Sequence, residues 1–221
     1  MVYRNATLED LPIIVEIYNS TIGSREVTAD TEPVSVADKL SWFNEHNPNT
    51  RPLWMIENEN EIIGWVSFQD FYGRPAYDVT AELSLYLKEQ YRNQGIGKTV
   101  VQYAISKCPQ LGINNLLGFV FEQNKNSLKM ISSLGFEEWG HLKNIAILDG
   151  KYCSLKIMGL KVSEKQLNFY SFYSWFKSYS KELVVVSFCS SNYRLHLSLR
   201  RIQRIFIYLF IIYHLINSVE S

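Results

Sequence analysis

The sequence predicts an α/β fold of the α+β type for residues 1–162, with a mixed, mostly antiparallel central sheet and helices on both of its faces. Strand and helix patterns follow one another in the order β-α-α-β-β-β-α-β-α-β-β. A glycine-rich turn joins one strand to a helix that leads to another strand, which predicts a parallel pair with a right-handed crossover. Asp149-Gly150 lies between two further strand patterns and is a signal of a type I′ hairpin.

The first third of the chain predicts a strand and two helices. Residues 2–6 form the opening strand, and residues 7–10 (Thr-Leu-Glu-Asp) form a capping box in which Asp takes the place of the usual Glu. The helix that follows has apolar residues at helical spacing. After a loop over residues 21–33, a second box at residues 35–38 begins another helix, which ends at the Asn-Pro-Asn of residues 47–49.

The middle of the chain predicts three strands and a helix. Residues 53–57 and 61–69 form a hairpin across a polar turn. A loop over residues 70–76 leads to a strand at residues 79–87. The glycine-rich turn follows that strand, and a helix begins at Lys98.

The last part of the domain predicts three strands and a short helix. Residues 113–121 are a near-continuous apolar run, as in a strand that is covered on both faces. Residues 124–133 form a helix closed by Gly135. Residues 136–148 and 151–160 complete the sheet as an antiparallel pair.

The composition restricts the function before any motif is considered. A chain of 221 residues with 47% hydrophobic residues can form a full core, and its net charge of zero argues against a nucleic-acid partner. Three cysteines and four histidines are scattered without metal-ligand spacing, so no metal site is expected. Such cysteines are typical of reduced thiols, and the first residues lack the apolar core of a signal peptide, which together favour a cytoplasmic protein.

Residues 163–221 differ in composition from the rest. All 11 glycines and all 6 prolines precede this segment, whereas it holds 13 of the 31 aromatic residues and 7 basic against 3 acidic side chains. Its longest apolar run is shorter than the ~18–20 residues that span a bilayer, so no membrane-spanning helix is expected. We expect a C-terminal extension, partly helical or disordered, that is not a selected functional unit. An extended or shifted reading frame as its origin and a basic amphipathic membrane anchor at residues 200–216 are both left open.

The turn at residues 92–97, Arg-Asn-Gln-Gly-Ile-Gly, has the chemistry of a phosphate site. Its two glycines permit positive φ and a close approach of ligand to backbone, and the helix that follows presents unpaired N–H groups with the positive end of its dipole. A glycine-rich turn without a ligand is the alternative. The dinucleotide fingerprint fails because Val100 takes the place of the third glycine, and the Walker spacing is absent.

An Arg-x-x-Gly-x-Gly turn between a strand and a helix resembles the coenzyme A loop of the GNAT superfamily of N-acetyltransferases. The resemblance covers about residues 2–162 and is closest to the branch of phosphinothricin and methionine-sulfoximine N-acetyltransferases. The residues that carry it are Ile17-Tyr18-Asn19, Thr31-Glu32-Pro33, Gly64-Trp65, Arg74-Pro75-Ala76-Tyr77, Glu82, Tyr86, Arg92 to Gly97, Asn124, Ser127 and Leu134-Gly135-Phe136.

The resemblance implies an enzyme that uses acetyl-CoA and no metal. Glu82 matches the family's general base, which acts through water on the acceptor amine; an exposed strand residue is the alternative. Asn124 is either a coenzyme contact or a helix cap. The residues implied to contact the coenzyme are Leu85, Tyr86, Leu87, Arg92, Asn93, Gln94, Gly95, Ile96, Gly97, Lys98 and Asn124.

The acceptor is expected to be a small amine of amino-acid type. Arg74 is the candidate contact for its acidic group, because a guanidinium binds a carboxylate by two parallel hydrogen bonds; a surface arginine is the alternative. The sequence departs from its relatives at Ala29 and Ser154, where a bulky Phe and an Asp are usual, and Ile131 stands where the family can place a general acid. The acceptor's identity and the general acid are therefore left open.

We expect direct attack of the amine on the thioester within a ternary complex, because no base lies near Cys108 or Cys153 in the sequence. Two other functions stay open: acetylation of a protein N-terminus or lysine, and a non-catalytic coenzyme A-binding regulatory module. A homodimer is also left open.

Overall fold

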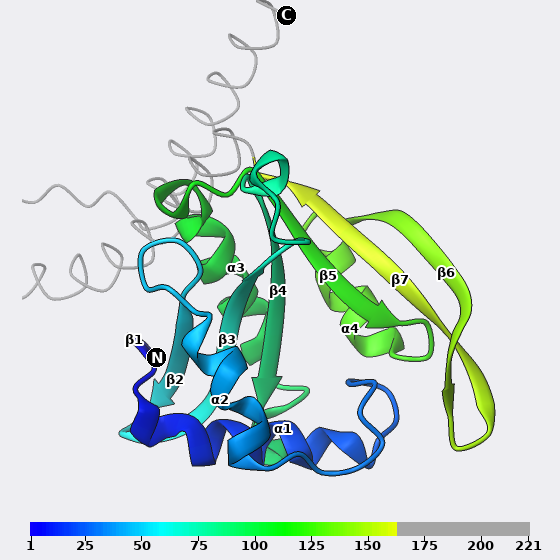
Figure 1. The fold of residues 1–221 in the computed structure, drawn as a ribbon, viewed down its shortest axis with the longest axis horizontal. Helices are drawn as coiled ribbons and strands as arrows, with labels where there is room; N and C mark the ends of the chain where they lie inside the picture. Colours follow the sequence, from blue (N-terminus) through cyan, green and yellow to red (C-terminus); the bar gives the residue numbers. More distant parts are fainter. Residues whose placement is uncertain (163–221) are drawn as a thin grey trace, which may run out of the picture. The chain divides into compact units, whose positions relative to one another are not determined.

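The computed structural model describes residues 1–162, so the expectations for residues 163–221 lie outside the described residues. The helices and strands follow the predicted order (Figure 1). The strands are β1 (Val2–Asn5), β2 (Leu53–Asn58), β3 (Glu61–Asp70), β4 (Thr80–Leu87), β5 (Asn115–Phe121), β6 (Glu137–Leu148) and β7 (Lys151–Lys161). The α-helices are α1 (Leu11–Ile22), α2 (Val36–Asn44), α3 (Ile96–Lys107) and α4 (Lys125–Ser132).

The seven strands form one sheet in the order β1-β2-β3-β4-β5-β7-β6. All neighbouring pairs are antiparallel except β4 and β5, which are parallel and joined through α3. The predicted fold class, with a mostly antiparallel sheet and a single crossover helix between parallel strands, is confirmed. Among residues 1–162, no helix is both long and apolar enough to cross a membrane.

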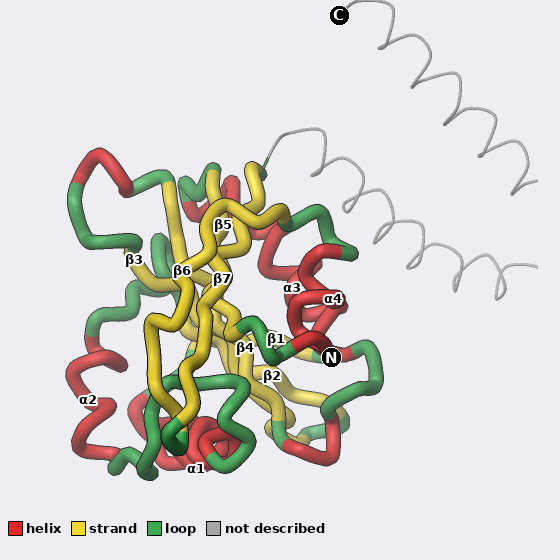
Figure 2. Tube along the Cα trace, turned by 90° about the vertical axis from the view of Figure 1, so that its right-hand side faces the viewer, coloured by secondary structure: helices red, strands yellow, loops and turns green. Residues whose placement is uncertain are grey.

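The helices cover the two faces of the sheet in pairs. Seen along the sheet, α1 and α2 lie on one side and α3 and α4 on the other (Figure 2). The larger hydrophobic cluster lies under α3 and α4 and includes Leu116, Val100 and Ile105, each with no exposed surface. A smaller cluster lies between α1 and the strands β2 and β3.

The parallel pair is short. Only three residue pairs join β4 to β5: Thr80 with Asn115, Ala81 with Leu116, and Glu82 with Leu117. Beyond Glu82 the two strands diverge, and each is paired on its other side alone, β4 with β3 and β5 with β7 (Figure 1).

The divergence corrects one expectation. The apolar run in β5 predicts a strand covered on both faces, yet Gly118 to Val120 is only half-buried. The reason is that this part of β5 has lost β4 as a neighbour. The C-terminal halves of the two strands therefore have backbone edges that are not paired with each other, and we call this gap between the two backbones the slot.

Several local predictions are confirmed in atomic detail. Ser35 begins α2 as a capping box, in which its hydroxyl accepts from the Asp38 N–H and the Asp38 carboxylate accepts from the Ser35 N–H at 2.8 Å. At the predicted hairpin turn, Asp149 and Gly150 have φ values of 49° and 76°, as a type I′ turn requires. Helix α3 begins at Ile96, two residues before the predicted start.

Candidate active site

A cavity of about 220 Å³ lies on the face of the sheet that α1 and α2 cover. Its floor is formed by alternate residues of β4, namely Glu82, Ser84 and Tyr86. These side chains share one face because successive side chains of a strand point to opposite sides of the sheet. The leucines between them point to the other face and pack against the core under α3.

Glu82 is the only acidic residue among those that line the cavity. It is half-buried and lies opposite Gln69 of β3, at the last position where β4 is still paired with β5. Burial raises the pKa of the Glu82 carboxyl above its usual 4.5, and the Ser84 hydroxyl opposes that shift in part. A carboxylate with a raised pKa accepts a proton more readily, as general-base catalysis near neutral pH requires.

Four aromatic rings line the cavity. Trp65 and Tyr86 are stacked with ring centroids 4.4 Å apart, and the Tyr18 ring lies 5.1 Å from that of Tyr86. Trp42 lies 5.5 Å from Trp65 and closes the side formed by α2. The Trp65 indole N–H also donates to the Ile14 carbonyl at 3.1 Å, which fixes the ring against α1.

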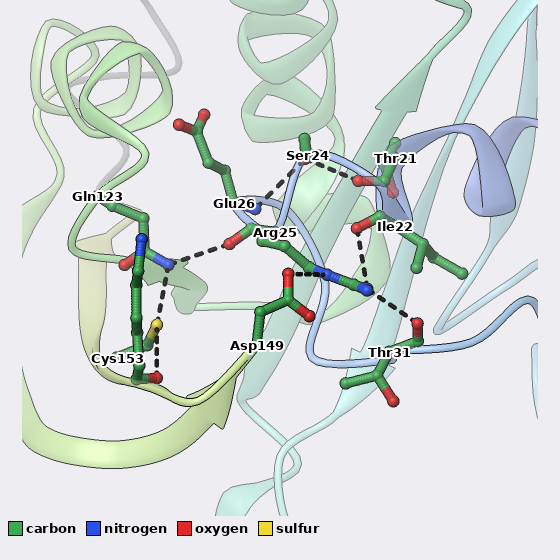
Figure 3. A network of polar contacts seen from close by, with 10 residues as sticks. Thr21, Ile22, Ser24, Arg25, Glu26, Thr31, Gln123, Asp149 and Cys153 are labelled. Atoms are coloured by element: carbon green, nitrogen blue, oxygen red, sulfur yellow. Dashed lines mark hydrogen bonds and ion pairs between the residues drawn. The ribbon is translucent and has the colours of Figure 1, made fainter.

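The loop between α1 and α2 is held against two distant parts of the chain (Figure 3). The Arg25 guanidinium donates to the Asp149 carboxylate at the β6–β7 turn and to the Thr31 carbonyl of its own loop. The Gln123 side-chain amide, just after β5, donates to the Arg25 carbonyl at 3.0 Å. These bonds hold the loop in one shape across its length.

This loop orients the phenol of Tyr18 in the cavity wall. The Tyr18 hydroxyl donates to the Asp30 carboxylate and contacts the Thr28 hydroxyl. Because the phenol has a single proton, Thr28 is the donor in that second bond. Burial and the Asp30 acceptor raise the pKa of Tyr18 to about 12, so the phenol is neutral near pH 7.

The predicted coenzyme loop lies at the open end of the β4–β5 slot. Asn93 and Gly95 have φ values of 59° and 80°, which place the turn in the left-handed region that glycine adopts without strain. Helix α3 begins with no side chain capping its N–H groups. A Cβ at Gly97 would meet only ordinary contacts, 3.6 Å from Leu85 and 3.9 Å from Met130, so the fold itself does not require glycine there.

These features fit a pyrophosphate and an extended arm. The uncapped N–H groups of α3 are donors for an anion. At Leu85, Tyr86 and Leu87, β4 has no strand partner on its β5 side, where a peptide-like chain can be added. Of the other predicted contacts, Gln94 and Lys98 are exposed and Ile96 is half-buried at the helix start. The predicted coenzyme contacts between Leu85 and Lys98 thus lie together at one end of the slot.

Arg92 and Asn124 have structural partners as well. The Arg92 guanidinium donates to the Leu87 carbonyl and to the Ser20 hydroxyl of α1, each at 2.9 Å. Asn124 caps α4 by accepting from the Ser127 N–H at 3.0 Å, and its amide N–H group donates to the Glu26 carbonyl. The cap that the sequence left as an alternative for Asn124 is therefore present.

Arg74 lies apart from these groups. It is exposed in the loop between β3 and β4, where it precedes the short 3-10 helix Pro75–Tyr77, and it does not line the cavity. Its role toward an acceptor stays a prediction. Among residues 1–162, no three His, Cys, Asp or Glu side chains are grouped as a metal site.

The sequence did not assign a role to most residues that line the cavity. Tyr18, Lys39, Trp42 and Trp65 come from three separate elements, α1, α2 and β3, and their approach depends on how α1 and α2 pack on the sheet. One signal was present in β4, where Glu82 and Ser84 interrupt an apolar strand at a spacing of two. Polar residues at that spacing indicate a face of the strand that is not core.

The fold and the site together match one family. The family model described as "Acetyltransferase (GNAT) family" matches residues 14–136. The chain belongs to this family, and it has the GNAT fold. It is therefore an acetyltransferase, and the acetyl donor of the family, acetyl-CoA, is its co-substrate.

The chain is also similar to individual acetyltransferases of this family. The chain is 49% identical over 164 residues, 74% of its length and 100% of the relative's, to YwnH of Bacillus subtilis, which is named as a candidate phosphinothricin acetyltransferase. It is 26% identical over 160 residues, 72% of its length and 93% of the relative's, to the L-methionine sulfoximine/L-methionine sulfone acetyltransferase of Pseudomonas aeruginosa. The crystal structure of a GNAT phosphinothricin acetyltransferase from Sinorhizobium meliloti with acetyl-CoA superposes with a TM-score of 0.68 at 26% identity, over 74% of this chain and 89% of that one.

Proposed function

We propose that the enzyme transfers the acetyl group of acetyl-CoA to the amino group of a small amino-acid-like acceptor. The observation that carries this proposal is the position of Glu82. Its half-buried carboxyl lines a cavity of about 220 Å³ and stands at the fork where β4 and β5 diverge. A base in the acceptor cavity is thereby adjacent to the slot that suits the coenzyme arm.

We assign to Glu82 the removal of a proton from the acceptor amine. An α-amino group has a pKa of roughly 8 or higher, so most acceptor molecules carry a proton near neutral pH and cannot attack. Glu82 accepts that proton through a bridging water, and its raised pKa makes it the stronger base for this step. The amine nitrogen then forms a bond to the acetyl carbon, the bond from that carbon to the sulfur of coenzyme A breaks, and the second proton of the nitrogen is taken up by the departing thiolate or by solvent.

The coenzyme is proposed to bind along the slot. The backbone of Leu85, Tyr86 and Leu87 faces the arm, and the loop from Arg92 to Lys98 surrounds the pyrophosphate. The support is the unpaired edge of β4 together with the uncapped start of α3. We also assign to Asn124 a contact at the far end of the coenzyme, because the sequence resemblance to the family implies it.

The burial of Cys108 argues against a covalent relay through that thiol and so favours direct attack. Cys108 has no exposed surface, and burial raises its pKa to about 12. A thiol of that pKa has almost no thiolate near neutral pH, and the thiolate is the nucleophile. Cys108 is therefore part of the core under α3.

Two other functions compete with this one. Acetylation of a protein or peptide amine would use the same base, and a regulatory module would bind the coenzyme without turnover. The size of the cavity favours a small acceptor, because pockets for larger ligands usually measure about 300–1,000 Å³.

Release of free thiol from acetyl-CoA distinguishes the three functions. The purified protein is mixed with acetyl-CoA and with single amino acids, methionine sulfoximine, phosphinothricin or peptides with free N-termini. We expect release with at least one amino-acid-like acceptor and none with peptides. Release with peptides alone would favour the second function, and coenzyme binding without any release would favour the third.

The domain boundary, partners and compartment stay proposals. Residues 1–162 form the catalytic domain, and residues 163–221 add nothing to it. A protein truncated after Val162 should fold, bind coenzyme and turn over like the full chain, and a loss of activity would show that the extension matters. Arg74 as an acceptor contact, a homodimer and a cytoplasmic location rest on the sequence alone.

A further inference from the structure

The cavity that holds Glu82 also holds one positive charge. Lys39 of α2 is the only basic residue among the residues that line it, and Glu82 is the only acidic one. All the other lining groups are apolar, aromatic, hydroxyl or amide. A cavity with one charge of each sign suits a ligand that carries both signs.

Lys39 is held in place by rings and by no carboxylate. Its ammonium nitrogen lies 4.3 Å from the centroid of the Tyr18 ring and 5.7 Å from that of Trp42. Within residues 1–162 it forms no ion pair, although eight other ion-pair contacts are present there. A cation over a ring face keeps N–H donors free for an anion.

The rings under Lys39 are themselves fixed. Tyr18 is oriented by Thr28 and Asp30, and the loop that carries these two residues is held by Arg25 (Figure 3). The start of α2 is fixed one turn before Lys39 by the Ser35 capping box. The ammonium group is therefore presented by a prearranged wall, as a recognition site requires.

We propose that Lys39 forms an oxyanion subsite, which binds the acidic group of the acceptor while Glu82 faces its amine. The inference rests on the proposed function and names the acceptor class as free amino acids with an ionised acidic group. A peptide N-terminus has a neutral amide where the free amino acid has its carboxylate. The subsite therefore also discriminates against peptides.

The test compares an acceptor acid with its carboxamide. In the wild type, the acid should have a kcat/KM about 10- to 100-fold higher than the amide, the range expected for one hydrogen bond between charged groups. Lys39→Met should remove that advantage by raising the KM of the acid and should leave the amide nearly unchanged. Lys39→Arg should restore part of it. The comparison between variants cancels the different basicity of the two amines.

Lys107→Met is the matched control. Lys107 is also a half-buried helix lysine, and its ammonium nitrogen lies 5.4 Å from the centroid of the Tyr103 ring, away from the cavity. Its loss should change neither acceptor. The KM for acetyl-CoA should be the same in all these variants.

Three results would overturn the subsite. The first is equal use of acid and amide by the wild type, and the second is an equal loss for both in Lys39→Met. The third is loss of the preference in Arg74→Ala instead, which would move the subsite to Arg74. If no amine is acetylated, the proposed function fails. Calorimetric binding of the acid to wild type and Lys39→Met then still decides the subsite, because equal affinities would exclude it.

Discussion

The leucines of β4 pack under α3 and α4, whereas the residues between them line the cavity under α1 and α2. The first set is Leu83, Leu85 and Leu87, and the second is Glu82, Ser84 and Tyr86. β4 thus packs in the hydrophobic core with one face and lines the cavity with the other. We therefore expect substitutions on the core face to lower stability, and substitutions on the cavity face to lower activity.

The largest effect is expected on the core face. Leu116 of β5 has no exposed surface and lies in the cluster under α3. Leu116→Ala should lower the free energy of unfolding by about 2–5 kcal/mol, because it removes buried methyl groups and leaves a cavity. Denaturant unfolding measures this loss. Ser84→Ala on the other face is the control, with a loss below about 1 kcal/mol, and equal losses would contradict the comparison.

The second effect is on turnover. Glu82→Gln keeps the shape of the side chain and removes its basicity, so kcat near neutral pH should fall about 100-fold. The loss should shrink at high pH, where the acceptor amine loses its proton unaided. A deficit that is the same at every pH would indicate a structural role for Glu82.

Glu82→Gln, which should lower kcat, should raise the stability of the folded protein near neutral pH. Because the pKa of Glu82 is raised in the folded protein, the unfolded chain releases this proton at lower pH. The folded state is therefore penalised as pH rises from the unfolded pKa through the folded one, and the penalty is complete above the folded pKa. Glu82→Gln should be as stable as wild type below about pH 4 and more stable near pH 7, as thermal unfolding at the two pH values would measure.

The smallest effect is expected on coenzyme binding, at the glycine turn where α3 begins. Gly97→Val should raise the KM for acetyl-CoA by at least about 10-fold, because a side chain there occupies the space of a ligand close to the backbone. The fold should be unchanged, since the new Cβ meets only ordinary contacts. Gly23→Val is the control, since Gly23 also has open space and a negative φ, −60°. Unchanged coenzyme affinity of a folded Gly97→Val protein by calorimetry would contradict the proposed cradle.

Local signals account for what the sequence predicted well. The Ser35–Asp38 box and the Asp149-Gly150 turn each act through neighbouring backbone groups, so their residue types are sufficient evidence. The alternation of strands and helices likewise follows from short-range periodicity. These signals gave the order of elements and the glycine turn before α3.

Long-range packing accounts for what it did not predict. Lys39 and Tyr18 reach the same cavity from different helices, and nothing near either residue in the sequence indicates the other. The divergence of β4 and β5 is hidden for the same reason. An apolar strand has the same pattern whether its neighbour continues beside it or turns away.

The three residue pairs between β4 and β5 have a mechanical consequence. On one side of this seam, β1 to β4 hold one another by antiparallel ladders, and on the other side β5, β7 and β6 do the same. Across the seam few backbone hydrogen bonds resist a pulling force, and beyond them the halves are joined by the packing of α3 and α4 and by the bonds of the α1–α2 loop to Gln123, Asn124 and Asp149. Under tension the molecule should part here first, so the line along which the sheet is weakest is also the line along which we propose that the coenzyme arm binds.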